Sequence, residues 1–137
     1  MRRLNPRSVE CAREFFADPS QQIFGAHPDA LPEDECVQYW IDGPLCAVFH
    51  PAPWPGVWMA HYALKPEGRG RGVEPAKRLL SAFCEAEKPA RIVGWTQASN
   101  RLAVAFARRC GFVVDGVLPL ESGDVLMQGY EPCQPEQ

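Results

Sequence analysis

The strongest constraint on the fold is the segment from Asn100 to Phe112, which reads N-R-L-A-V-A-F-A-R-R-C-G-F. Asparagine is a preferred helix N-cap, the apolar residues that follow recur at helical spacing, and Gly111 is the residue type that most often ends a helix. A second glycine-bearing run, E-G-R-G-R-G over residues 67–72, also leads into an amphipathic segment. We therefore expect a domain in which strands pass through glycine-bearing loops into helices.

The remaining pattern predicts an α/β class protein, a mixed β-sheet with helices packed on its faces. Strands are predicted over 45–50, 57–64, 91–96, 112–118 and 125–130, and helices over 5–18, 73–87 and 99–110. A further short helix is predicted after Pro32, ending at Gly43 and Pro44, with its buried face formed by Cys36, Val37, Tyr39 and Trp40. The chain is interpreted as one domain with a helical part (1–42), a core (43–130) and a tail (131–137).

Composition excludes several classes of function. The 137 residues include 46% hydrophobic and 23% charged residues, and the net charge of −3 argues against nucleic acid as the main partner. No apolar run approaches the roughly 18 residues of a membrane span, and no signal peptide is predicted behind Arg2 and Arg3, so a cytoplasmic protein is expected. The six cysteines and three histidines are too dispersed to predict a metal site.

The glycine-bearing loop over 67–72 is a candidate site for an anionic ligand. A strand that enters such a loop and then a helix exposes backbone N–H groups at the positive end of the helix dipole. Arg69 and Arg71 would add charge-assisted contacts to phosphate. The loop lacks the Lys-Ser/Thr of a P-loop and the third glycine of a dinucleotide fingerprint, so a turn without any ligand remains an alternative.

Together the two segments resemble the GNAT superfamily of N-acetyltransferases. Arg69-Gly-Arg-Gly72-Val-Glu74 is similar to that family's coenzyme A loop, Gln/Arg-x-x-Gly-x-Gly/Ala, in all but the last position. The family's later motif, Asn-x-x-Ala-x-x-Leu/Phe-Tyr-x-x-x-Gly-Phe, is matched at Asn100, Ala103, Phe106, Gly111 and Phe112. The resemblance covers residues 43–130 and implies a GNAT-like fold.

The resemblance also implies a ligand and a reaction. Acetyl-CoA would lie between the strands 57–64 and 91–96 as a cosubstrate, and a small-molecule or peptide amine would accept the acetyl group. A backbone N–H near Leu64 would polarise the thioester carbonyl. The residues implied in coenzyme binding are Leu64, Arg69, Gly70, Arg71, Gly72, Val73 and Asn100.

The chain departs from the family's pattern at two places. Ala107 replaces the tyrosine that protonates the departing thiolate, so Tyr62 on the central strand is the candidate general acid, with an apolar packing role expected for Cys110. Glu74 and Pro75 bring a carboxylate to the phosphate loop and remove one N–H from it.

Histidine 61 and, more weakly, Glu85 are candidate bases, although a purely structural strand histidine is an equal alternative. Tyr39, Trp40 and Trp54 are candidates for lining the acceptor pocket.

Two functions are consistent with these observations. The first is an N-acetyltransferase that uses acetyl-CoA. The second is a catalytically inactive GNAT-fold binding or structural protein, such as a bacteriophage head-assembly or internal virion component. The final strand pair could form an edge for a homodimer or for assembly into a larger particle.

Overall fold

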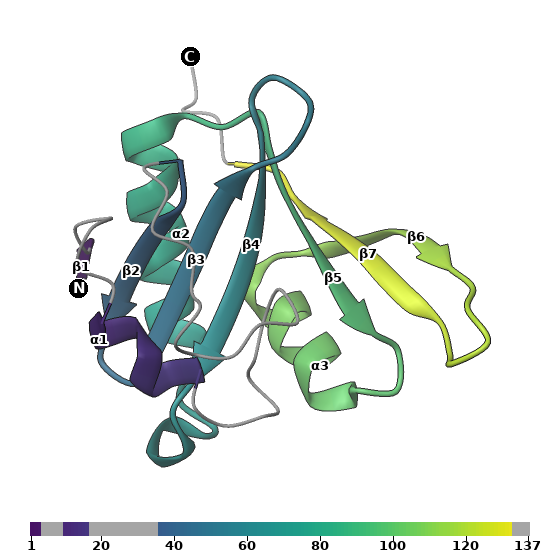
Figure 1. Cartoon of the computed structure of the whole chain (residues 1–137), viewed down its shortest axis with the longest axis horizontal. Coiled ribbons are helices and arrows are strands. Elements are labelled where there is room, and N and C mark those ends of the chain that lie inside the picture. The colour runs from purple at the N-terminus through teal and green to yellow at the C-terminus, as the bar shows by residue number, and fades with distance from the viewer. Residues whose placement is uncertain (4–9, 17–35, 133–137) are drawn as a thin grey trace.

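A mixed β-sheet forms the centre of the molecule in the computed structural model, which describes residues 1–3, 10–16 and 36–132 (Figure 1). Its order is β1-β2-β3-β4-β5-β7-β6, and every neighbouring pair is antiparallel except β4 and β5, which are parallel. The strands are β1 (Arg2–Arg3), β2 (Gln38–Asp42), β3 (Leu45–Pro51), β4 (Val57–Leu64), β5 (Arg91–Gln97), β6 (Val113–Leu118) and β7 (Val125–Tyr130). The predicted mixed sheet is confirmed.

Helices cover both faces of the sheet (Figure 1). The α2 face carries α2 (Val73–Glu87) and α3 (Arg101–Cys110), and the α1 face carries α1 (Glu10–Arg13) and the 3-10 turn η1 (Glu14–Phe16). Of the helix predicted over 5–18, residues 10–13 are α-helical and residues 14–16 form a 3-10 turn, and the predicted cap at Asn5 lies outside the described residues. None of the described helices is long and apolar enough to cross a membrane.

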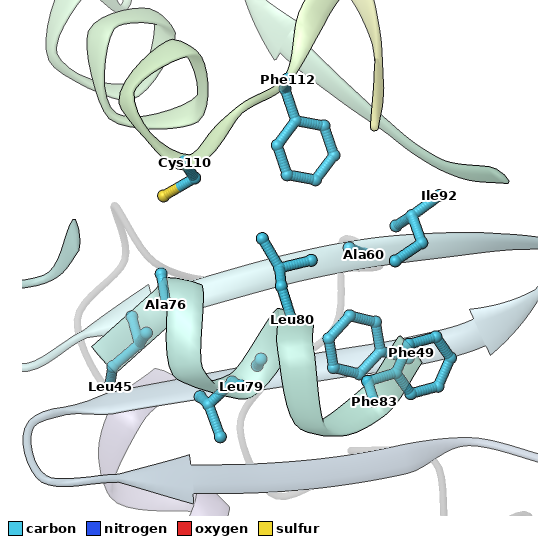
Figure 2. Close-up of a cluster of buried hydrophobic side chains, with 11 residues drawn as sticks. Leu45, Phe49, Ala60, Ala76, Leu79, Leu80, Phe83, Ile92, Cys110 and Phe112 are labelled. Carbon is cyan, nitrogen blue, oxygen red and sulfur yellow. The ribbon is translucent and has the colours of Figure 1, made fainter. Parts of the chain in front are cut away.

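The larger core cluster lies between the sheet and α2. Apolar residues of α2 recur three and four positions apart and point toward the strands, as Figure 2 shows for Leu79, Leu80 and Phe83. Phe83 stacks on Phe49 of β3 with ring centroids 4.0 Å apart. Fully burying a side chain of this size contributes about 1.5–3 kcal/mol, so α2 is held by packing more than by its uncapped N-terminus.

A smaller cluster covers the α1 face. It joins Ala12, Phe15 and Phe16 of the N-terminal segment to buried residues of three strands, which are Tyr39 on β2, Cys46 and Val48 on β3, and Ala63 on β4. Strands β2 to β4 are therefore covered on both faces, which accounts for the dense apolar content of 45–49.

The helix predicted to end at Gly43 is wrong where it covers residues 38–42, because these residues form β2. Gln38 and Trp40 point to the α2 face while Tyr39 and Ile41 point to the α1 face. A run that is buried on both sides has no polar alternation to distinguish a strand from a helix. Pairing with β3 decides between them, and Gly43, at φ +58°, forms the hairpin turn instead of a helix end.

The segment from Asn100 to Phe112 folds as predicted. Asn100 Oδ1 accepts a hydrogen bond of 3.2 Å from the Ala103 N–H, which caps α3. Gly111, at φ +108°, ends the helix, and its N–H is bonded to carbonyls of the last turn. This local closure carries Phe112 directly into the core beneath β4.

Candidate functional site

The central feature of the site is a divergence between β4 and β5. The two strands pair only over Val57–Met59 and 91–93, and beyond Met59 they separate (Figure 1). Among the described strands, β3 alone pairs with β4 from Ala60 to Leu64. The side of β4 that faces β5 is therefore released from its neighbouring strand beyond Met59. A strand edge of this kind can pair with an extended ligand that carries amide groups.

The glycine-bearing loop begins where β4 ends. The 3-10 turn η4 (Pro66–Gly68) leads to Gly70, whose φ of +82° is a backbone conformation that favours glycine. Gly72 is the N-cap of α2, and a Cβ at this position would lie 3.1 Å from Phe106 of α3 and 3.2 Å from Leu64. The absence of a side chain at Gly72 thus allows α3 to approach the end of β4 closely.

Several backbone donors of this loop are free. Within the described residues, no acceptor contacts the N–H groups of Gly70, Gly72, Val73 and Glu74, and the first helical hydrogen bond runs from Ala76 to Gly72. Pro75 follows at the third helical position, where an N–H would have no partner inside the helix. Pro75 therefore breaks no hydrogen bond of the helix, and the four N–H groups before it remain available to a ligand.

A hollow of about 710 Å³ adjoins the loop on the side of the β2–β3 turn. No residue of β5 or α3 lines it, so it is separate from the divergence of the two parallel strands. Its lining residues are Asp42, Gly43, Pro44, Lys65, Glu67, Gly70, Arg71, Val73, Glu74, Pro75 and Arg78.

The cations of this hollow are already engaged by the protein. Arg78 pairs with Asp42 at 2.7 Å, a contact that raises the pKa of Arg78, and the nearby Glu74 raises it further. Lys65 pairs with Glu14 at 2.7 Å, and the Arg71 guanidinium donates to the Glu67 carbonyl. The carboxylate of Glu74 thus lies beside a positive charge.

His61 lies on the α1 face of β4, beside His50 of β3. Their Nε2 atoms are 3.0 Å apart and their rings are stacked, with an interplanar angle of 12°. Burial, with a smaller contribution from the neighbouring His50, lowers the pKa of His61 to about 4. At neutral pH His61 is therefore an uncharged imidazole. Sequence reasoning missed His50, because only the β3–β4 register brings the two rings together.

Tyr62 lies on the opposite face of β4, inside the larger cluster. Its ring makes edge contacts with Phe106 (5.7 Å between centroids) and Phe112 (6.4 Å). Its hydroxyl is buried and has no hydrogen-bond partner among the residues that the structure describes. Burial raises the pKa of this hydroxyl well above its usual range, with a smaller contribution from Cys110, so Tyr62 stays protonated. The two predicted catalytic side chains are therefore not brought together but lie on either side of the sheet.

The structure also shows whether the other candidate site residues are buried or exposed. Glu85 is solvent-exposed on α2. Tyr39 is fully buried in the smaller cluster and Trp40 packs against the larger one, so these two are core residues, whereas Trp54 is exposed on the β3–β4 loop. Cys110 is buried, and burial raises the pKa of its thiol to about 11, as expected for a packing role.

The prediction for Cys36 differs from the structure. Cys36, expected on a buried face, is exposed, because the segment it precedes is a strand. In the part of the chain that the structure describes, no group of three or more histidine, cysteine or acidic side chains could hold a metal ion.

Comparison with solved structures identifies the fold. A chimera of spermidine N-acetyltransferase SpeG from Vibrio cholerae and hSSAT superposes with a TM-score of 0.75 over 95% of this chain and 93% of its own, at 17% identity. The IAA acetyltransferase from Bacillus cereus gives 0.68 over 96% and 97%, at 14% identity. The microcin C7 self-immunity acetyltransferase MccE, solved with acetyl-CoA and AMP, gives 0.55 over 65% and 54%, at 20% identity.

A GNAT-family acetyltransferase from Bacillus anthracis is also similar, with a TM-score of 0.55 and 18% identity, although the chain spans only 57% of its length. No family model and no curated protein matches the sequence. These likenesses show the architecture: the chain has the GNAT fold.

Proposed function

We propose that this chain is an N-acetyltransferase that moves an acetyl group from acetyl-CoA to a small-molecule or peptide amine. The observation that carries the proposal is that two features lie together at one end of β4. The strand loses its β5 partner after Met59, and the loop that follows presents four free backbone N–H groups at a helix N-terminus. The GNAT fold and the acetyltransferase names of its structural neighbours support the same activity.

The residues present fit a coenzyme with a diphosphate and an amide arm. The N–H groups of Gly70, Gly72, Val73 and Glu74 would hold the diphosphate, with Arg69 exposed beside them and without an ion-pair partner in the described part of the chain. The side of β4 that faces away from β3 beyond Met59 would hold the arm. Asn100 caps α3, so its contribution to coenzyme binding would be to orient that helix. Acetyl-CoA supplies an activated acyl group when it is bound.

His61 and Tyr62 lie on opposite faces of β4, so their roles in the transfer would be on opposite sides of the strand. On the α1 face an amine would meet the uncharged His61 imidazole, which is 3.0 Å from His50 and whose pKa of about 4 makes it a weak base. On the α2 face a departing thiolate would lie on the side of the Tyr62 hydroxyl, whose raised pKa keeps it protonated and makes it a weak acid. We assign His61 as the proton acceptor and Tyr62 as the proton donor, in place of the tyrosine absent at Ala107.

The decisive experiment is calorimetric titration of the purified chain with acetyl-CoA and with CoA. Micromolar binding is expected, and it should weaken at least tenfold in Gly72→Ala, since the added Cβ meets Phe106 and Leu64. Gly116→Ala is the matched control, because a Cβ there meets nothing within 4 Å. The absence of heat at millimolar coenzyme would refute the proposal.

Turnover separates the enzyme from the inactive binding protein. The chain is incubated with acetyl-CoA and pools of polyamines, amino acids and peptides, and acetylated products are detected by mass spectrometry. Loss of acetyl transfer in both His61→Gln and Tyr62→Phe, with coenzyme binding retained, supports the assigned roles. Coenzyme binding without any product would favour the binding protein.

A further inference from the structure

A second histidine contacts the residue assigned above as the proton acceptor. His50, near the end of β3, is directly opposite Met59 of β4, and His61 is directly opposite Val48 of β3. The two histidines are therefore diagonal neighbours on the α1 face. Their Nε2 atoms are 3.0 Å apart, which is a hydrogen-bond distance, and their rings are nearly parallel. Two neutral imidazoles in this arrangement share one proton, so one ring donates and the other accepts.

The other nitrogen of His50 decides which ring donates. Its Nδ1 atom lies 3.4 Å from the carbonyl oxygen of Pro51, and a carbonyl oxygen can only accept a hydrogen bond. A neutral His50 that makes this contact carries its one proton on Nδ1 and has a lone pair on Nε2. The proton between the rings then belongs to His61, whose Nε2–H donates to His50. This tautomer places the lone pair of His61 on Nδ1.

The pair lies where the two parallel strands separate. Met59, opposite His50, is the last residue of β4 that pairs with β5. His61 is two residues further along β4, on the same face and beyond the point of divergence. His61 is therefore beside the opening between the strands, and His50 lies behind it, on the side of β3.

We propose that His50 is a positioning residue for the acetyl transfer, which accepts the Nε2–H of His61 and so holds the lone pair of His61 on Nδ1, where it takes the proton of the substrate ammonium. This inference rests on the proposed function and adds a residue to it. When the ammonium gives its proton to Nδ1, the amine nitrogen keeps the electron pair of the broken N–H bond and attacks the thioester carbonyl. His61 becomes an imidazolium, and its Nε2–H stays bonded to His50.

The hydrogen bond to His50 also assists a base that burial has weakened. Burial disfavours the imidazolium of His61 because it removes water from the charged ring. A neutral acceptor at 3.0 Å favours the imidazolium, since a hydrogen bond from a charged donor is about twice as strong as one between neutral groups. A positive charge on His50 has the opposite effect and lowers the pKa of His61. Neutral His50 is thus the form that assists proton transfer.

Nitrogen-15 NMR of the imidazole rings tests the tautomers on the full-length chain, without coenzyme or substrate. The spectra are recorded at alkaline pH, and the rings are assigned by comparison with His50→Phe and His61→Gln. His61 is expected to carry its proton on Nε2 and His50 on Nδ1. In His50→Phe, which keeps a ring but offers no acceptor, His61 should become a mixture of both tautomers. An Nδ1-protonated His61 in the wild-type chain would overturn the proposal.

Steady-state kinetics test the role in the reaction. The rate constant kcat of acetyl transfer should fall about tenfold to a hundredfold in His50→Phe, because a hydrogen bond to a charged group is lost. The KM for the amine and the Kd of the coenzyme should stay within about twofold, since His50 contacts neither. His50→Gln is the conservative variant, because its amide oxygen can accept the same hydrogen bond, and it should lose less activity than His50→Phe.

The outcomes separate this inference from the proposed function. Circular dichroism and thermal unfolding check that each variant is folded. A wild-type chain that turns over no amine would overturn the catalytic roles of both histidines. Turnover that is unchanged in His50→Phe, or that falls equally in His50→Gln and His50→Phe, would overturn the role of His50 and leave the acetyltransferase proposal intact.

Discussion

Replacing Tyr62 by phenylalanine should stabilise the protein while it impairs acetyl transfer. The Tyr62 hydroxyl is buried without a hydrogen-bond partner, and it is held among aromatic rings that include Phe106 and Phe112. An unsatisfied buried polar group costs about 1–3 kcal/mol, because it loses its hydrogen bonds to water on folding. Phenylalanine keeps the ring contacts and removes that cost, so the free energy of unfolding should rise by about 1 kcal/mol or more.

The matched control is Tyr39→Phe. Tyr39 is as deeply buried, but its hydroxyl is not left without a partner. Removing a satisfied hydroxyl forfeits a hydrogen bond and exposes its partner to the same penalty, so Tyr39→Phe should destabilise the protein by about 0.5–3 kcal/mol. The same chemical change is thus expected to have opposite signs at the two positions.

Both variants are measured by urea unfolding, followed by far-ultraviolet circular dichroism and tryptophan fluorescence, with linear extrapolation to water. Acetyl transfer is measured in parallel, and Tyr62→Phe should lower it by about 10²–10⁴ if the hydroxyl donates the proton. A loss of stability above about 1 kcal/mol in Tyr62→Phe would refute the reasoning, since it would mean that the hydroxyl is hydrogen-bonded in the folded state.

Three further results are expected. The folded state lowers the pKa of His61 from 6.5 to about 4, so the unfolded chain binds more protons between these values. Stability should therefore fall by up to about 3 kcal/mol as the pH drops from 6.5 to 4, and His61→Gln should flatten that slope in unfolding titrations. Asn100→Ala removes the cap of α3 and should cost about 1 kcal/mol, whereas Ser99→Ala, one residue earlier, should cost little. Cys46 is fully buried and burial raises the pKa of its thiol to about 12, so thiol reagents should modify exposed Cys36 before Cys46, as peptide mapping would show.

Much of the fold could be predicted because its signals are local. The bounds of β4 and α2 were predicted to the residue, since a dense apolar strand, a glycine loop and a helical repeat follow one another within 57–87. The cap at Asn100 and the stop at Gly111 belong to the same kind of signal. The β2 segment lacked such a local signal, because a short run buried on both faces fits a helix and a strand equally well.

The candidate site was only partly predictable for a related reason. The loop needs glycine where φ is positive, at Gly70, and where neighbouring side chains pack closely, at Gly72. Both requirements can be recognised in the sequence because they select glycine. The partner of His61 depends on the register between β3 and β4, and the isolation of the Tyr62 hydroxyl depends on what three separate elements place around it. Neither contact produces a residue spacing that can be recognised in a single sequence.

The sequence by itself determined which segments become strands and helices, where the glycine loop and the helix cap fall, and that successive residues of β4 point to opposite faces. Those properties depend on dihedral preference and periodicity, which act over a few residues. Only the tertiary structure decided that β7 inserts between β5 and β6, that β4 and β5 part after Met59, and that the pairing of β6 with β7 shifts register between Val114 and Gly116. Those features depend on hydrogen bonds and packing between residues far apart in the chain, whose partners are chosen only when the sheet assembles.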